Sequence, residues 1–509
     1  MENIKNFIID ALKKGENEYF EFKEAKNDFP KDAMETISAF ANTDGGYLIL
    51  GVKEVSDGEF EIQGVKNINK VKNRMFDLLH QPGYISYNPI NNHNVIEHSL
   101  QIENSTANIL IVKVPKVPYN FKPVYINNND HYTYIRKGSS DYLCDRKLVE
   151  SMIRDASEES YDSVSIENYT IDDLDKVTIR NFRDKFKLIK PEHPFNNMSD
   201  EQFLIKINAL RKSRTTNKIE PTVAGLLVFG NHSSLKEYMP HYNVEYINKT
   251  KHNKNNSFVD RLIYDGMWGE DNLYNFFNNC IEKLYLTINE SSQIDDDSIT
   301  RVSTSKLKIA IREALINSII HCDYHNELGI VITRYSDRFV FKNGGSLRIS
   351  KTDFFKGGHS KPRNYYIQEI FRQINLCEKA GSGVPKIMDA VEANKYKYPE
   401  LTADFDQVEF ILWDTTIIDN FGITKEIEKD ILKIIISDKT ATIKSIEKKL
   451  NIHRNTASKY LNDLTEKGIL FRAKIGRSYV YSFAINKDFD KYNVIEIMYS
   501  MIDKVKNII

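Results

Sequence analysis

The chain has 509 residues, of which 41% are hydrophobic and 28% are charged, and its formal net charge at pH 7 is −1. This length exceeds what one hydrophobic core supports, so we expect two to four domains of ordinary globular composition. A near-neutral charge excludes a uniformly basic protein, and any basic surface that binds nucleic acid must therefore be local.

Membrane and disulfide chemistry are not expected. No stretch approaches 18 consecutive apolar residues, and the N-terminus lacks the apolar core of a signal peptide, so we expect a cytoplasmic protein with no membrane partner. The four cysteines show no Cys-x-x-Cys spacing, which argues against zinc sites and a disulfide framework: Cys144, Cys280, Cys322 and Cys377.

The first predicted unit covers residues 1–155 and alternates strands with helices. Strands are expected at 19–23, 47–52, 59–63, 109–114 and 131–136, and helices at 2–14, 31–41, 67–80 and 146–155. This alternation predicts a compact α/β or α+β domain. An acidic, serine-bearing linker is predicted at 157–163.

A connecting domain is predicted at 164–300. Its clearest strand is expected at 224–230, an amphipathic helix at about 270–286, and an exposed polar loop at 248–257. The next predicted domain covers residues 301–415.

Polar and glycine residues stand out in the 301–415 domain. Glu313 and Asn317 are four residues apart in an apolar run of helical period, which places both on one helix face. Mg²⁺ takes one or two such oxygen ligands together with substrate phosphates. Asn343-Gly344-Gly345 follows an alternating strand at 339–341, and Gly381-Ser382-Gly383 opens a helical run, so both could bring backbone N–H groups to phosphates. Taken alone, each motif is more commonly a solvated or capped polar pair or a turn.

Together these motifs resemble the GHKL-type ATPase-like domain found as the C-terminal part of RecG-like proteins. The resemblance rests on 312–317, 323–324, 343–345, 360–364 and 378–383. It implies a GHKL-like ATP-binding sandwich in which Glu313 orients the attacking water and Asn317 holds Mg²⁺. It also implies that the glycine segments frame adenine and phosphates, giving the nucleotide-binding set Glu313, Asn317, Asn343, Gly345, Gly381 and Gly383.

One position departs from the GHKL pattern, because Asn343 stands where the family carries an aspartate. An amide both accepts and donates hydrogen bonds, so ATP binding is still expected while adenine specificity and turnover stay open. No Gly-x-x-x-x-Gly-Lys-Ser/Thr motif occurs, which argues against a motor helicase.

The N-terminal segments 16–23 and 37–52 resemble the Schlafen/AlbA-type domain. Gly45-Gly46 would let the chain turn sharply from a helix into a buried strand. Some members of that family are metal-dependent RNA-cleaving nucleases with three acidic residues, and the resemblance places these at Glu16, Glu21 and Glu54. Such carboxylates could hold Mg²⁺ or Mn²⁺, with Glu16 and Glu21 as the metal ligands.

Two alternatives to catalysis stay open in this unit. The carboxylates could simply be solvated on an alternating strand, with Lys23 neutralising Glu21, and the domain could bind nucleic acid without cutting it. Lys23, Lys26 and Lys31 lie close in sequence and could contact phosphates.

Residues 424–485 are predicted to form a winged helix-turn-helix similar to those of bacterial transcription regulators. Helices are expected at 427–435, 443–450 and 453–467, and wing strands at 469–474 and 478–483. Residues 424–483 hold 13 Lys and Arg against 7 Asp and Glu, which favours DNA. The third helix would present Arg454, Asn455, Thr456 and Lys459 to base edges, and Lys474 and Arg477 of the wing would contact phosphates. A protein-contact or dimerisation role is the alternative.

An amphipathic helix is predicted at 486–509, which could dock on its own domain or form a homo-oligomer. The whole pattern predicts an α/β and α+β multidomain protein with DNA or RNA as its partner. Two functions compete. One is a nucleotide-regulated nucleic-acid-binding protein, a candidate metal-dependent endonuclease of bacterial stress or antiphage defence. The other is a ligand- or ATP-sensing transcriptional regulator that binds operator DNA through its winged helix.

Overall fold

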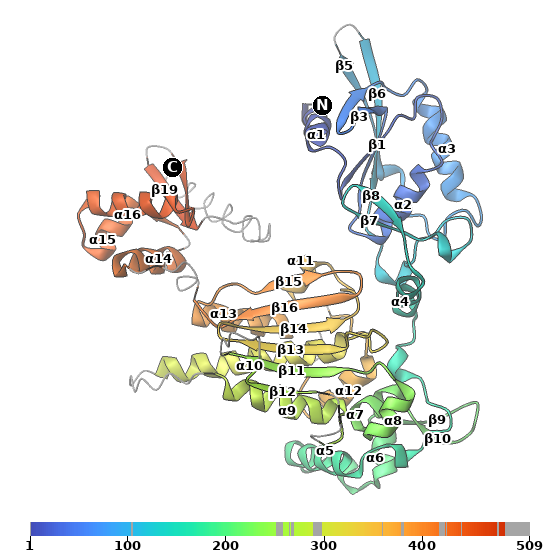
Figure 1. The fold of residues 1–509 in the computed structure, drawn as a ribbon, viewed down its shortest axis with the longest axis vertical. Coiled ribbons are helices and arrows are strands. Elements are labelled where there is room, and N and C mark those ends of the chain that lie inside the picture. Colours follow the sequence, from blue (N-terminus) through green and yellow to red (C-terminus); the bar gives the residue numbers. More distant parts are fainter. Residues whose placement is uncertain are drawn as a thin grey trace. The chain divides into compact units, whose positions relative to one another are not determined.

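The computed structural model describes residues 2–102, 105–250, 258–263, 265, 269–288, 298–358, 360–377, 381–416, 423, 425–438, 440–475 and 478–483. The chain forms two compact units (Figure 1): residues 1–164 with 363–365, and residues 165–362 with 366–509. Arg477, the predicted helix at 486–509 and most of the predicted loop at 248–257 lie outside the described residues.

The first unit is built on a four-stranded sheet of order β1-β2-β6-β5. Strand β1 pairs in parallel with β2, whereas β6 is antiparallel to both β2 and β5. Two hairpins, β3-β4 and β7-β8, complete its strands. The strands are β1 (Phe20–Lys23), β2 (Gly46–Leu50), β3 (Val52–Ser56), β4 (Glu59–Ile62), β5 (Val95–Ile102), β6 (Ser105–Val114), β7 (Tyr134–Lys137) and β8 (Ser140–Leu143).

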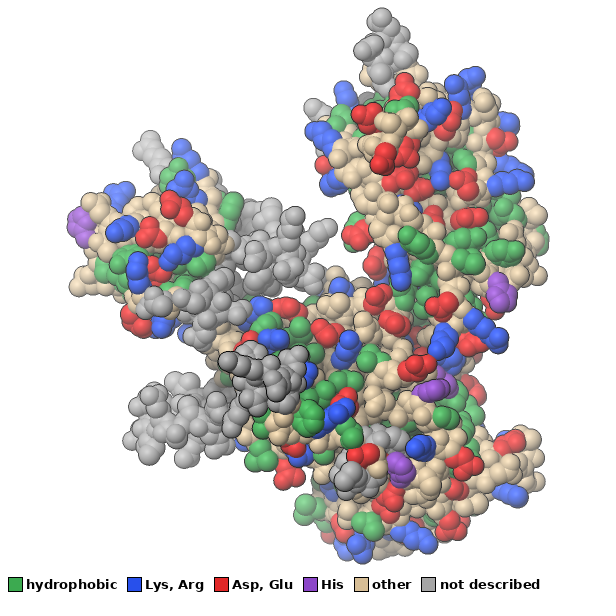
Figure 2. Space-filling model, viewed as in Figure 1, with side chains coloured by type: hydrophobic (Ala, Val, Ile, Leu, Met, Phe, Trp, Pro, Cys, Tyr) green, Lys and Arg blue, Asp and Glu red, His purple; other side chains and the backbone are tan. Residues whose placement is uncertain are grey.

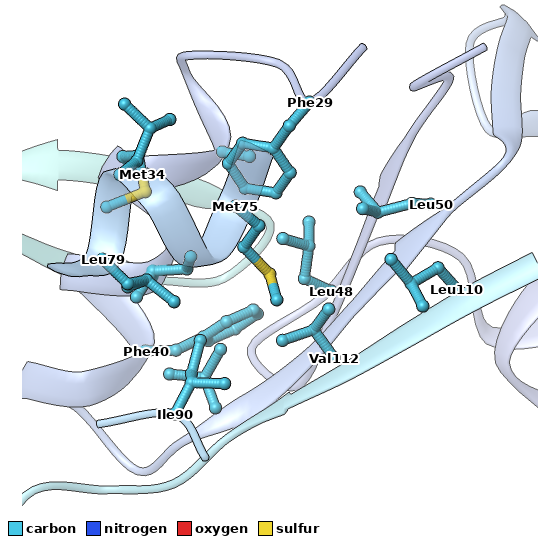
Figure 3. Packing of buried hydrophobic residues seen from close by; sticks show 14 of the residues in the cluster. Phe29, Met34, Phe40, Leu48, Leu50, Met75, Leu79, Ile90, Leu110 and Val112 are labelled. Atoms are coloured by element: carbon cyan, nitrogen blue, oxygen red, sulfur yellow. The ribbon is translucent and has the colours of Figure 1, made fainter. Parts of the chain in front are cut away.

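Helices cover both faces of this sheet. The helices are α1 (Glu2–Lys14), α2 (Ala33–Asn42), α3 (Ile68–His80) and α4 (Arg146–Ala156). On one face Met34 and Phe40 of α2 and Met75 of α3 pack against Leu48 and Val112 of the strands (Figure 3). On the other face α1 contributes Ile8 and Ala11 to a second apolar cluster. The predicted α/β layout is confirmed, although β3, β5 and β8 were not predicted.

The turn from α2 into β2 depends on glycine. Gly45 has φ +79°, and a Cβ there would lie 2.8 Å from the backbone of Val114 and Lys116. A Cβ on Gly46 would lie 2.5 Å from the ring of Phe40. The left-handed conformation and the close packing both require residues without a side chain.

The second unit is organised by a six-stranded sheet of order β12-β11-β13-β14-β16-β15. Helix α10 packs against β14, with α9 and α13 beside it, which gives a two-layer α/β arrangement (Figure 1). Because β11 and β12 come from the segment before residue 300, the sheet runs across the predicted boundary between the connecting and ATPase-like domains. The strands are β11 (Val244–Lys249), β12 (Asp260–Leu262), β13 (Ile330–Tyr335), β14 (Arg338–Gly344), β15 (Glu400–Ala403) and β16 (Gln407–Trp413).

Helices dominate the rest of this unit. They are α5 (Lys176–Ile189), α6 (Asp200–Lys206), α7 (Val223–Phe229), α8 (His232–Tyr238), α9 (Leu273–Leu286), α10 (Ser298–His321), α11 (Lys351–Lys356), α12 (Tyr365–Gln373) and α13 (Gly383–Asn394). A small hairpin pairs β9 (Leu210–Lys212) with β10 (Ile219–Pro221).

The predicted strand at 224–230 is wrong, because this segment forms helix α7. All seven of its residues are buried, so the sequence shows no period that separates a helix from a strand. The Thr222 side chain accepts from the N–H of Gly225 and starts the helix. Gly225 also allows a close approach, since a Cβ there would overlap the carbonyl of Ala209 at 1.9 Å.

The C-terminal described segment has the predicted order of elements. Three helices, α14 (Glu426–Asp438), α15 (Ile443–Leu450) and α16 (Arg454–Glu466), enclose a small core with the sheet β17-β19-β18. The strands are β17 (Ala441–Thr442), β18 (Leu470–Ile475) and β19 (Ser478–Phe483). Strand β17 was not predicted, and the assignment of this segment to the winged-helix class stays a prediction.

The remaining elements are short 3₁₀ helices at Asn92–Asn94, Tyr119–Phe121, Asp130–Tyr132, Tyr161–Ser163, Ile171–Asp173 and Pro194–Asn197. All four cysteines are free and buried. Within the part of the chain that the structure describes, no helix is long and apolar enough to span a bilayer. The helices and sheets of the two units confirm the predicted mixed α/β multidomain fold.

Candidate functional site

The polar pair of α10 meets the start of α13. A Cβ on Gly383 would lie 3.0 Å from Oε2 of Glu313 and 3.4 Å from Nδ2 of Asn317. Residues about 70 positions apart in the chain are thus brought together because α10 and α13 pack side by side. Glycine at position 383 leaves room beside both polar side chains, which a Cβ would crowd.

A pocket opens between these helices and the sheet, with an empty volume of about 860 Å³ that includes open solvent. It is lined by residues of α10, β14, β16, α11, α13 and their loops: Ala314, Asn317, Ser318, His321, Asn343, Ser346, Leu347, Arg348, Ile349, Phe354, Gly357, Ser360, Lys361, Gly381, Gly383, Val384, Ile387, Leu401, Val408 and Phe410.

The pocket lining combines an apolar wall with basic groups. Phe354, Ile387 and Phe410 offer a flat apolar surface, whereas Arg348 and Lys361 supply positive charge. None of the lining residues that the structure describes is an Asp or a Glu. A ligand with an apolar ring and an anionic tail matches this distribution of charge.

Four of the six predicted nucleotide residues line the pocket: Asn317, Asn343, Gly381 and Gly383. Asn343 is buried at the end of β14, and its Nδ2 donates to the carbonyl of Gly344 at 3.1 Å. Gly345 does not line the pocket. Its φ is +98°, and its N–H donates a hydrogen bond to the carbonyl of Asp406 at 2.7 Å. Gly345 therefore fixes the turn after β14.

Glu313, the sixth residue, lies behind the pocket wall. Its side chain is 7% exposed and pairs with Arg312 Nη2 at 3.3 Å and Lys386 Nζ at 3.6 Å. These two cations compensate the buried carboxylate. A water-orienting role for Glu313 stays a prediction.

A second glycine pair, which the sequence analysis did not select, borders the pocket. Gly357 and Gly358 have φ of +68° and +81°, and the N–H of Gly358 donates to the carbonyl of Gly381 at 3.1 Å. A Cβ on Gly357 would lie 2.6 Å from Pro385. Adjacent glycines directly after the short apolar run of α11 are the signal that could have identified this loop.

The predicted catalytic carboxylates of the first unit have different surroundings. Glu16 accepts from the N–H of Phe22 at 3.0 Å. Burial raises the pKa of Glu16, partly offset by that hydrogen bond. Glu54 is exposed on β3 and accepts from the N–H of Gly58 at 3.1 Å. No group of three or more His, Cys, Asp or Glu in the described part of the chain is arranged to hold a metal ion, so this trio is not brought together as one.

Glu21, in contrast, belongs to a buried ion network. Its Oε2 lies 2.8 Å from Arg136 Nη2, and the two side chains are 7% and 1% exposed. Arg136 also pairs with Asp141 at 2.9 Å and donates to the carbonyls of Asn17 and Phe20. The network ties β7 and β8 to the start of β1, which gives Glu21 a role in the fold.

Lys23 is part of the same network. Its Nζ lies 2.9 Å from both Glu21 and Asp32. Burial acts to lower the pKa of Lys23, but these two ion pairs outweigh it and raise the value. A nucleic-acid phosphate would have to compete with both carboxylates for this lysine.

The predicted recognition helix α16 has an open polar face. The His453 side chain accepts from the N–H of Asn455 at 3.2 Å, whereas Ala457, Leu461 and Leu464 point into the core. Arg454, Asn455 and Lys459 are exposed, and Thr456 is half-buried. Lys474 of β18 is also exposed. The predicted contact residues of α16 therefore lie mainly on the solvent side.

Ion pairs in this segment gather at α14 rather than at α16. Glu428, which is 2% exposed, pairs with Lys467 at 3.0 Å and Lys425 at 3.3 Å. Burial opposes the effect, yet these lysines hold the pKa of Glu428 below its usual value. Among the described residues, Arg454 and Lys459 have no carboxylate within 4.0 Å.

Family models match several parts of the chain. The Schlafen, AlbA_2 model matches residues 16–145, and the model described as "Putative ATP-dependent DNA helicase recG C-terminal" matches 328–412. A domain of unknown function, DUF8451, matches 150–245. The C-terminal domain of SoFic-like protein adenylyltransferases matches 425–487.

None of the curated proteins matches the chain. Among solved structures, the DIP2311 protein from Corynebacterium diphtheriae is 17% identical and has a TM-score of 0.40, covering 92% of this chain and 79% of that chain.

The two principal matches agree with the resemblances drawn from the motifs. The first covers Glu16, Glu21 and Glu54, and the second covers the glycine loops of the pocket. The chain therefore carries a Schlafen AlbA_2 domain followed by an ATPase-like domain of the recG C-terminal type.

Proposed function

We propose that the chain is a nucleotide-regulated nucleic-acid-binding protein. The pocket between α10, α13 and the sheet carries this proposal, because it lies in the ATPase-like domain and suits a nucleotide. The base would stack on the apolar wall that includes Phe354 and Phe410. The phosphates would lie near Arg348, Lys361 and the glycines 381 and 383.

The glycine loops support this orientation of the nucleotide. Ser382 precedes α13, and its side chain makes no capping hydrogen bond to the helix. Backbone N–H groups at a helix start, with Arg and Lys nearby, stabilise phosphate charge. Gly383 at this position lets a ligand approach the backbone closely.

The predicted Mg²⁺ fits the pocket only with help from the ligand. Asn317 offers one amide oxygen, and no carboxylate belongs to the described part of the pocket lining. Mg²⁺ usually keeps water and substrate phosphates among its six ligands. Asn317 would therefore hold the ion on the nucleotide, where it would neutralise phosphate charge.

Thermal unfolding of the full chain with ATP, ADP, AMP or GTP tests the pocket. A nucleotide at about 100 times its Kd adds roughly 2.7 kcal/mol of stability to the state that binds it. Lys361→Ala should lose about 1.5–3 kcal/mol of binding free energy, because it removes a charge-assisted phosphate contact. Lys351→Ala is the matched control, because Lys351 is exposed on α11 and does not line the pocket.

A null result has a clear consequence. If no nucleotide stabilises the wild type with or without Mg²⁺, the ATPase-like domain is a scaffold and nucleotide regulation is excluded. If Lys351→Ala weakens binding as much as Lys361→Ala, the phosphates lie outside the pocket.

The transcriptional-regulator alternative is supported by α16. Its exposed Arg454, Asn455 and Lys459 have the chemistry for DNA contacts, and the neighbouring α14 holds most of the ion pairs. Selection of sequences from a random duplex pool distinguishes the two functions. A regulator should enrich one operator-like sequence, whereas a general nucleic-acid-binding protein should enrich none.

Nuclease activity is the narrower form of the first proposal. Glu16, Glu21 and Glu54 would have to act with Mg²⁺ or Mn²⁺, although Glu21 is already paired with Arg136 and Lys23. That pairing favours nucleic-acid binding over cleavage. Incubation of labelled RNA and DNA with each metal, against an EDTA control, tests cleavage directly. A stress or antiphage role would follow if expression of the chain protects cells from phage only when Lys361 is intact.

A further inference from the structure

The basic residues of the first unit differ in how far they are neutralised. Lys14, Lys72 and Lys116 each lie within 2.8 Å of a carboxylate. By contrast, Lys26, Lys66 and Arg74 are exposed and have no carboxylate within 4.0 Å among the described residues. Figure 2 shows basic and acidic side chains interspersed over the visible face of this unit.

These three residues and Lys70 belong to two adjoining segments. The N–H of Lys66 donates to the carbonyl of Lys26 at 3.0 Å, which joins the loop after β1 to the start of α3. Lys70 and Arg74 are one helical turn apart, and the buried Val71 and Met75 direct them outward. We refer to Lys26, Lys66, Lys70 and Arg74 as the α3 patch.

One carboxylate lies within the α3 patch. Asp28 Oδ2 is 3.6 Å from Lys70 Nζ, and both side chains are more than half exposed. A hydrogen bond from the Phe29 N–H, with smaller contributions from Lys70 and Arg74, lowers the pKa of Asp28. Asp28 is the one carboxylate within 4.0 Å of any of these four bases among the described residues, so the bases outnumber it.

We propose that the α3 patch binds the phosphate backbone of a nucleic acid. The inference rests on the proposed nucleic-acid-binding function and assigns its contact surface in the first unit. Lys26, Lys66 and Arg74 have no carboxylate within 4.0 Å among the described residues, and Lys70 is only weakly paired, so all four can contact phosphates. Such contacts carry no base specificity. Lys23, which the sequence suggested, is less suited because Glu21 and Asp32 already neutralise it.

The test measures salt dependence on the full chain by fluorescence anisotropy. Labelled single-stranded RNA, single-stranded DNA and duplex DNA are titrated over a series of KCl concentrations. Changing Lys26, Lys66, Lys70 and Arg74 together to Gln should lower the slope of log K against log salt by about 3, because each lost phosphate contact removes roughly 0.7–0.9. Affinity near 100 mM salt should fall about tenfold or more.

A matched variant controls for net charge. Lys5, Lys13, Lys53 and Lys113 are exposed elsewhere in the same unit, and changing these four to Gln removes equal charge. Both variants are also measured with Arg454→Ala and Lys459→Ala in place, so that binding through α16 does not mask the patch. All the substituted side chains are exposed, and unchanged thermal unfolding confirms that the fold is retained.

The outcomes separate this inference from the proposed function. If the wild type binds none of the three nucleic acids, the proposed function fails. If the wild type binds but the patch variant has the same slope as the matched control, the α3 patch is not the contact surface while the proposed function stands. A larger loss of slope in the patch variant, with the control unchanged, supports the inference.

Discussion

Glu21→Gln distinguishes a role in the fold from a role in catalysis. Glu21 and Arg136 form a buried pair at 2.8 Å, with side chains 7% and 1% exposed. Removing one partner of such a pair costs about 3–5 kcal/mol, because the other charge stays buried. Arg136 keeps Asp141 and two backbone carbonyls, so we expect the lower end, about 3 kcal/mol. For a unit of this size, that corresponds to a fall in Tm of roughly 6–12 °C.

The assay follows unfolding of the first unit within the full chain by hydrogen exchange of β1 and β2 amides during thermal or urea denaturation. Glu54→Gln is the matched control, since Glu54 is exposed on β3 and should change stability by less than about 0.5 kcal/mol. The reasoning is refuted if Glu21→Gln leaves the exchange of these strands unchanged. Loss of RNA cleavage with unchanged stability would instead make Glu21 a metal ligand.

Three further measurements test other groups. Burial raises the pKa of Glu16 above 4.5, so the folded state binds a proton at higher pH than the unfolded state. The wild type should therefore gain stability relative to Glu16→Gln as the pH falls from 7 to 4.5, and parallel pH profiles would contradict this. Burial lowers the pKa of Lys122 to about 7, so competitive acylation should titrate this amine near 7, and a midpoint near 10 would contradict it. Arg454→Ala with Lys459→Ala should lower the salt slope of duplex DNA binding by about 2, whereas Lys433→Ala on α14 should not.

Helices and strands whose apolar residues repeat with a clear helical or strand period could be predicted from the sequence. The helix at 443–450 has the predicted bounds, and α16 and β14 differ by only a few residues. The strand prediction for 223–229 failed for a physical reason. A run that is buried on every side shows no alternation of apolar and polar residues. Its helical state depends on the Thr222 cap and on contact with a distant carbonyl.

The candidate site was partly predictable for a related reason. Asn317 and Gly383 carry local signals, namely spacing on a helix and a glycine before one, and the fold then brings them together. The partner of Glu21 carries no such signal, because Arg136 is 115 residues away and becomes a neighbour only when β7 packs against α2. A motif can identify a candidate carboxylate, but it cannot show whether that carboxylate already forms an ion pair with a buried cation.

The strand order of the second unit also determines where the chain can be divided. Strand β11 pairs in parallel with all six residues of β13. A fragment that begins at residue 301, where the motifs place the domain start, would leave β13 with an open row of backbone donors and acceptors. Exposed apolar edge strands recruit other chains, so such a fragment should aggregate, whereas one that begins before Val244 should stay monodisperse.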